Sequence, residues 1–431
     1  MLFKFKGHRV RIHHVFYVYL LLFMAGRMQG QIIIDHTCTH IHAVPDSAIE
    51  NAKDSLHIAY DHTSHGSQII TGMNPLDTFM GGTGMYVWSN GGGAGILDLH
   101  DYFSPVGDLG SETSWSPATR NYLNDAANAD VNVIMWSWCN IYGHNIQGYL
   151  DSMEVLIADY GPGGTRILDG TRTIPVTFVF MTGHSNMEES QNEWTFNANK
   201  QIRQHCLNNN RVLYDFYDIE CYDPDGTYFG DAEAEAADYG TYNGIRKLDD
   251  DCSYNLDGGG RGNWATAWQG THTEGVDWYS CSAAHSQPLN GNLKAYGAWW
   301  LFARLAGWNG LYPVALKVKI FMDGAYNSGV MNTNLQSSGY LPLTSPYDTT
   351  TVSSIPANVV DWVQVEIRSE ADGSGENYTA SAFLRQDGMI IDRTGSEEIT
   401  IIAKEGDYYI GVRHRNHLPV MSNGTVHLAY P

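Results

Sequence analysis

Residues 56–68 (LHIAYDHTSHGSQ) join a short apolar run to a turn of small and polar side chains. The run 56–60 predicts a buried β-strand, and the apolar pair after the turn, Ile69 and Ile70, is consistent with the start of a helix. A serine at such a strand-to-helix turn, here Ser64, exposes its hydroxyl beside backbone N–H groups that can receive an oxyanion. Taken alone, the same residues also describe an ordinary surface turn.

A second segment, residues 281–288 (CSAAHSQP), precedes an apolar helical stretch far downstream and places His285 just before it. A serine near the start of the chain and a histidine just before the last helix occur in the chain order of one hydrolase superfamily, and they resemble its nucleophile and general base. The two segments together therefore favour a hydrolase over a surface turn.

Between residues 31 and 310, short apolar strands alternate with helical stretches. The predicted strands are 56–60, 131–136, 176–181 and 212–217, and the predicted helices are 47–55, 117–126, 145–159, 197–208 and 291–305. This alternation predicts an α/β domain built on a doubly wound, three-layer parallel sheet. Ligands of such sheets bind at the carboxyl ends of the strands, which is where Ser64 stands.

Residues 311–431 have a different pattern, which predicts an all-β sandwich domain. Alternating or β-rich runs, separated by turns of Gly, Asn and Asp, lie at 315–322, 362–367, 379–384, 389–391, 399–403 and 408–414. Residues 413–421 (RHRNHLPVM) resemble part of a C-terminal module of secreted Bacteroidetes-type proteins.

Residues 1–30 predict a signal peptide, because a basic stretch precedes the apolar run 15–26. A single N-terminal anchor is the alternative, although twelve residues are short for a membrane span. No other segment is long and apolar enough to span a bilayer, so a secreted, periplasmic or cell-surface location is expected. The formal charge of −22 argues against a nucleic-acid partner. Six cysteines suit an oxidising compartment, and we expect a disulfide between Cys252 and Cys281.

Several of these segments resemble the SGNH (GDSL-like) hydrolase superfamily, in particular a branch of secreted bacterial proteins. They are 58–73 (IAYDHTSHGSQIITGM), 136–140 (WSWCN), 180–186 (FMTGHSN), 213–226 (LYDFYDIECYDPDG) and 281–290 (CSAAHSQPLN). The resemblance implies a flavodoxin-like α/β fold, a nucleophilic Ser64 and a general base at His285. It also implies an oxyanion hole formed by the Ser64 N–H, by Gly107 or Gly110, and by Asn140.

The sequence departs from the superfamily at the third member of the triad. Ser282 stands three residues before His285, where the superfamily has aspartate. Asp277 is the preferred replacement because it lies in the same loop, and Asp218 or Glu220 after the fourth strand are alternatives. A dyad of serine and histidine without any acid is a further alternative.

Other side chains near these segments are candidates for binding. His62, His65, His184 and Trp138 are predicted substrate contacts, with structural histidines and a core tryptophan as the alternatives. Residues 249–260 (DDDCSYNLDGGG) are rich in hard oxygen ligands, and Asp251, Asn255 and Asp257 partly match the start of an EF-hand loop. They predict a structural calcium site, with a solvated acidic loop as the alternative, and the reaction itself requires no cofactor.

The sequence thus predicts an exported serine esterase that removes acyl groups from a carbohydrate or a small ester. A non-catalytic carbohydrate- or surface-binding protein on a decayed hydrolase fold is the alternative, and the missing aspartate favours it. A polysaccharide lyase that uses the histidines and carboxylates differently is a third hypothesis.

Overall fold

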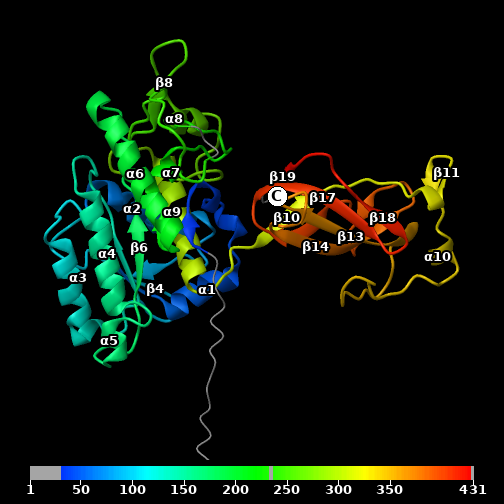
Figure 1. Cartoon of the computed structure of the whole chain (residues 1–431), viewed down its shortest axis with the longest axis horizontal. Coiled ribbons are helices and arrows are strands. Elements are labelled where there is room, and N and C mark those ends of the chain that lie inside the picture. The colour runs from blue at the N-terminus through cyan, green and yellow to red at the C-terminus, as the bar shows by residue number, and fades with distance from the viewer. Residues whose placement is uncertain (1–30, 233–235, 429–431) are drawn as a thin grey trace, which may run out of the picture.

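The computed structural model describes residues 31–232 and 236–428, which form a parallel α/β part followed by an antiparallel β-rich part (Figure 1). The predicted signal peptide, residues 1–30, lies outside the described residues. Within the described ranges, none of the helices has the length and apolar character needed to cross a bilayer.

Seven strands form one sheet in the order β1-β7-β6-β5-β2-β4-β3, and every neighbouring pair is parallel. The strands are β1 (Ile33–Ile34), β2 (His57–Asp61), β3 (Trp88–Ser89), β4 (Leu97–Asp101), β5 (Val133–Trp136), β6 (Thr177–Met181) and β7 (Val212–Tyr214). The chain proceeds outward from β2 to β4 on one side and from β5 to β7 on the other, so the order reverses between β2 and β5. Such a reversal is the point at which ligands bind in doubly wound sheets. The predicted parallel α/β sheet is confirmed.

Helices cover both faces of this sheet. They are α1 (Asp46–Ser55), α2 (Ser67–Phe79), α3 (Trp115–Asn124), α4 (Ile146–Tyr160), α5 (Thr165–Leu168), α6 (Glu189–Asn209), α7 (Phe216–Glu220), α8 (Trp264–Gln269) and α9 (Pro288–Leu305). Successive strand residues point to opposite faces. Ile58 and Tyr60 of β2 therefore join the core formed with α1, α2, α7 and α9, whereas Ala59 joins the core formed with α3, α4 and α6.

Helix α9 is central to the first core, since every residue from Leu289 to Arg304 is buried. Pro288 occupies its first turn, where the missing N–H costs nothing. Trp300 of α9 packs on Tyr312 of the antiparallel part, with ring centroids 5.6 Å apart. The loop that carries His285 is therefore held by a deeply buried helix directly after it.

The antiparallel part contains a sheet in the order β15-β14-β13-β17-β18, with β19 also paired to β17, and a separate β10–β16 pair. Its elements are β10 (Tyr312–Leu316), β11 (Tyr326–Asn327), β12 (Val330–Met331), α10 (Asn334–Ser337), β13 (Val359–Arg368), β14 (Asn377–Arg385), β15 (Ile390–Ile391), β16 (Ile399–Ala403), β17 (Gly406–His414), β18 (His417–Met421) and β19 (Val426–Leu428). The predicted β-rich region is present, and its closure into a sandwich remains a prediction.

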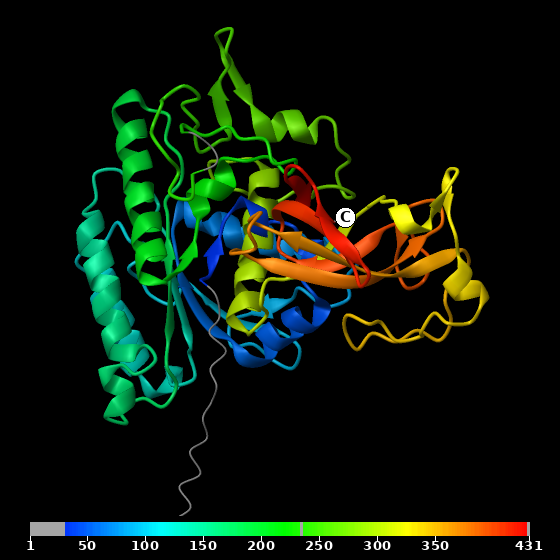
Figure 2. The same cartoon turned by 45° about the vertical axis from the view of Figure 1, so that its right-hand side comes forward.

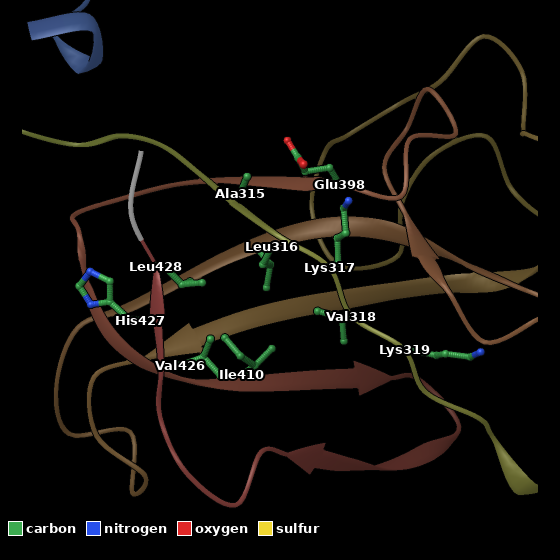
Figure 3. Close-up of a pocket in the computed structure, with 10 residues that line it drawn as sticks. All are labelled: Ala315, Leu316, Lys317, Val318, Lys319, Glu398, Ile410, Val426, His427 and Leu428. Atoms are coloured by element: carbon green, nitrogen blue, oxygen red, sulfur yellow. The ribbon is translucent and has the colours of Figure 1, made fainter. Parts of the chain in front are cut away.

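A groove of about 540 Å³ lies in the antiparallel part (Figure 3). Its walls are mainly aliphatic, including Leu316, Ile410 and Leu428, with Lys317 and Glu398 among the lining residues. It contains neither Ser64 nor His285, so this groove is separate from the predicted active site.

Candidate active site

Ser64 lies on a tight turn, η3 (Ser64–Gly66), between the end of β2 and the start of α2. Its φ angle is +31°, in a region that non-glycine residues seldom occupy. Behind it, the Gly66 carbonyl accepts a 2.9 Å hydrogen bond from the Tyr60 hydroxyl. A Cβ at Gly66 would lie 2.0 Å from Ser137 Oγ, so this close approach requires glycine. The turn therefore fixes the direction of the serine side chain at the carboxyl end of β2.

His285 reaches Ser64 from the loop that precedes α9. Its Nε2 lies 2.5 Å from Ser64 Oγ, although the two residues are 221 positions apart in the sequence. His285 also has a positive φ angle, +62°. The histidine is exposed and the serine is partly buried, so the pair is open to solvent. This dyad has the geometry of a nucleophile with its general base, and the juxtaposition predicted from the sequence is present.

Within residues 31–232 and 236–428, no carboxylate forms an ion pair with His285. The preferred acid, Asp277, is exposed, and its Oδ2 accepts a 2.8 Å hydrogen bond from the Thr273 N–H across a short turn. Asp218 and Glu220 form ion pairs with buried cationic side chains instead. The structure therefore brings none of the three predicted acids into contact with the histidine, because local pairing engages each of them elsewhere.

Asp250 is a carboxylate of this site that the sequence analysis does not select. Its Oδ2 lies 2.8 Å from His65 Nε2. Burial raises the pKa of Asp250 above its usual range. Asp250 is thus a carboxylate of the site that pairs with His65 and not with the histidine of the dyad.

Three imidazole rings are stacked next to the serine. The His65 ring lies between those of His285 and His184, with centroid distances of 4.5 and 3.7 Å and interplanar angles of 18° and 10°. Burial lowers the pKa of both His65 and His184 to about 4, so these two rings are neutral near pH 7. The stack restricts the orientation of His285 from one side.

A buried polar network lies beneath the dyad. Lys294 of α9, which is fully buried, donates 2.5 Å hydrogen bonds to Gln68 Oε1 and Glu220 Oε1. Gln68 in turn donates from Nε2 to the Ala284 carbonyl, also over 2.5 Å. Gln68 stands one helical turn after the serine, and Ala284 directly precedes the histidine. The network therefore connects the two segments that carry the dyad.

The three predicted oxyanion donors differ in their distance from the serine turn and in their hydrogen bonds. Gly107 lies against the serine turn, since a Cβ there would be 2.9 Å from Thr63 Cγ2. The Gly110 N–H is already used, because it donates to Asp108 Oδ1 over 2.8 Å. Asn140 is exposed and accepts a 2.9 Å hydrogen bond from a backbone N–H through its side-chain oxygen. Gly107 is thus the glycine that remains available for an oxyanion, and the role of Asn140 remains a prediction.

Two of the predicted substrate contacts are core side chains. His62 is completely buried, and its Nε2 lies 2.7 Å from Asp101 Oδ1. Trp138 is buried as well and donates from Nε1 to the Met181 carbonyl over 3.1 Å. Neither side chain lines the surface around the dyad, whereas His65 and His184 belong to the imidazole stack beside it.

The predicted calcium ligands do not converge. Asp251 caps a turn, and Asn255 Oδ1 accepts a 3.1 Å hydrogen bond from the guanidinium of Arg261. Asp257 forms a 3.0 Å ion pair with Arg246. The segment folds as a hairpin of β8 (Ser253–Asn255) and β9 (Arg261–Asn263), which projects from the α/β part in Figure 2. Calcium binding by this acidic segment remains a prediction.

The predicted disulfide between Cys252 and Cys281 is not formed, and all six cysteines are free thiols. Cys252 Sγ lies 3.4 Å from Ser286 Oγ, whereas Cys281 Sγ donates to the Pro288 carbonyl over 3.4 Å. The two thiols therefore have separate hydrogen-bond partners, one in the loop before α9 and one at the first residue of α9.

Of the residues that the sequence analysis missed, Lys294 gives the clearest sequence signal. It is a single cation within the apolar helical stretch 291–305, and lysine is almost never fully buried unless it is paired. Asp250 has no comparable signal, because it is one of three consecutive aspartates.

Comparison of the chain with protein-family models, with curated proteins and with solved structures finds no match. The geometry of the site and the sequence segments therefore carry the functional argument.

Proposed function

We propose that this chain is a serine esterase in which Ser64 is the nucleophile and His285 is the general base. The observation that carries the proposal is the 2.5 Å separation of Ser64 Oγ and His285 Nε2 at the carboxyl end of β2. That edge lies at the reversal of strand order, where doubly wound sheets bind ligands. The resemblance of the sequence segments to SGNH hydrolases supports the same assignment.

In the proposed reaction, His285 Nε2 accepts the proton from Ser64 Oγ as this oxygen attacks the ester carbonyl carbon. The N–H groups of Ser64 and Gly107 donate to the oxyanion that forms. The protonated histidine then transfers its proton to the departing alkoxide, which leaves an acyl-serine. Water, activated by the same histidine, hydrolyses the acyl-serine and releases the acid.

We further propose an acylated carbohydrate or a small ester as the substrate. The exposure of His285 supports this choice, because an open site can accept an acyl group that projects from a large polar molecule. The prediction of export supports it as well, since acylated polysaccharides are met outside the cell.

A fluorescent fluorophosphonate probe tests the proposal on the full chain. We expect labelling of the native protein, loss of labelling in Ser64→Ala, and retained labelling in Ser282→Ala. Ser282 is an exposed serine on the loop that carries His285, which makes it a matched control. His285→Gln should reduce turnover of p-nitrophenyl acetate and of acetylated oligosaccharides by roughly 10²–10⁴-fold. Labelling that is unchanged in Ser64→Ala contradicts the proposal.

A non-catalytic carbohydrate-binding protein is the second candidate. This candidate is favoured because no carboxylate in the described part of the chain forms an ion pair with His285. A folded protein that is not labelled, has no turnover on either substrate and binds deacetylated oligosaccharides in calorimetry would support this candidate instead.

A further inference from the structure

Two buried histidines and one carboxylate converge beside the dyad. One ring nitrogen of His65, one ring nitrogen of His184 and one carboxylate oxygen of Asp250 all lie within 4.8 Å of one another. They come from three separate segments: the η3 turn, the loop after β6 and the loop before β8. Two imidazoles with one carboxylate are a donor set typical of divalent transition-metal sites.

His184 presents an unpaired lone pair to this group. Its Nδ1 is hydrogen-bonded to the Ser185 carbonyl, so Nδ1 carries the proton and Nε2 has the free lone pair. His184 is 3% exposed, and its Nε2 has no hydrogen-bond partner among the described residues. Metal-binding histidines typically donate the second ring nitrogen to a backbone carbonyl or a carboxylate in this manner. The buried, unpaired Nε2 therefore points to a ligand.

The electrostatic surroundings suit a cation. Asp250 is the acidic member of the set, and its Oδ2 lies 2.8 Å from His65 Nε2. The carboxylates of Asp249, Asp250 and Asp251 also lie within 4.8 Å of one another, which adds negative charge on the same side.

We propose that His65, His184 and Asp250 bind one divalent transition-metal ion of the zinc class beside the dyad. In tetrahedral zinc sites the ligand atoms stand roughly 3.4 Å apart, so short side-chain rotations bring the three together. The rings of His65 and His184 must tilt out of their 3.7 Å stack, because a ring nitrogen coordinates in the plane of its ring. Three protein ligands leave a fourth position open, as in catalytic zinc sites.

This inference goes beyond the proposed ester hydrolysis and does not depend on it, because metal binding is measured without substrate. Fluorophosphonate labelling of the metal-free protein reports separately on the dyad, so the two proposals can fail independently.

The test uses full-length protein stripped with EDTA and titrated with Zn²⁺ in a calorimeter, with bound metal counted by mass spectrometry after gel filtration. We expect one ion per chain, and affinity reduced by at least about 10–100-fold in His184→Gln and in Asp250→Asn. Protein loaded with Co²⁺ should show the visible absorption of a four-coordinate site, and His184→Gln should abolish it. His57→Gln, in the separate group of His57, Asp98 and Asp130, is the matched control and should bind normally.

Circular dichroism verifies that each variant is folded before titration. Zinc binding that is unchanged in folded His184→Gln, binding that is lost in His57→Gln, or no binding at millimolar zinc overturns the proposal.

Discussion

Replacing Lys294 by methionine should destabilise the protein and also slow the proposed ester hydrolysis. The ammonium group is completely buried on α9 and lies 2.5 Å from Glu220 Oε1, and Glu220 itself is 1% exposed. Methionine keeps most of the volume but removes the charge. It therefore leaves the carboxylate of Glu220 buried without its cation, and it also removes a donor from Gln68.

The size of the effect follows from this burial. Removing one partner of a buried ion pair costs about 3–5 kcal/mol, far more than the loss of an exposed pair. Glu220 retains a 2.8 Å hydrogen bond from the Ser185 N–H, which favours the lower half of that range. At about 2–3 °C per kcal/mol for a part of this size, a loss of about 3–4 kcal/mol should lower the melting temperature by roughly 6–12 °C.

Urea unfolding followed by circular dichroism measures the loss, and Lys317→Met, at an exposed lysine, is the control. The double variant Lys294→Met with Glu220→Gln should recover at least half of the lost stability, because no unpaired charge is then buried. Esterase kcat should fall in Lys294→Met, since Gln68 no longer holds the Ala284 carbonyl firmly. A loss of stability below 1 kcal/mol, or a double variant as unstable as the single one, would refute this reasoning.

Two further predictions concern the turn after β2. Gly66→Ala should lower the free energy of unfolding by about 1–3 kcal/mol and reduce fluorophosphonate labelling, because the new Cβ would lie 2.0 Å from Ser137 Oγ. Thermal denaturation and labelling assays measure the two effects. Gly258→Ala, where a Cβ would meet open space, is the control and should change neither stability nor labelling. Asp61 is fully buried, and desolvation raises its pKa to about 7. Its ionisation therefore lowers the free energy of unfolding by up to about 4 kcal/mol as the pH rises from about 4 to 8. Asp61→Asn should therefore be more stable than the native protein at pH 8 but not at pH 4 in urea titrations, and an equal gain at both values would contradict the assignment.

The parts of the fold that could be predicted from the sequence are those with strong local patterns. The apolar runs of β2, β5 and β6 are visible as buried parallel strands, and the Ser64 turn follows directly from the first of them. Strand β4 (LDLHD) escaped prediction because only two of its five residues are apolar and the other three are two aspartates and a histidine. Its backbone pairing with β2, a long-range contact, decides its conformation.

In the site as well, residues with a clear local sequence context could be predicted, whereas residues placed by long-range folding could not. The order and context of Ser64 and His285 were sufficient to predict that they meet. Asp277 was preferred for its closeness in sequence, yet its carboxylate closes its own turn. Asp250 could not be selected, because its position beside His65 depends on how the loop before β8 folds over the sheet edge.

The sequence separation of 221 positions from Ser64 to His285 has a consequence for biosynthesis. At a translation rate of about 5–20 residues per second, the serine is made roughly 10–45 s before its histidine. Since the histidine loop is anchored by α9, the nascent chain has no assembled dyad until that last helix of the α/β part has left the ribosome. The proposed hydrolytic activity would thus be absent from every truncated product that ends before α9, which delays the reaction until the whole α/β part has been made.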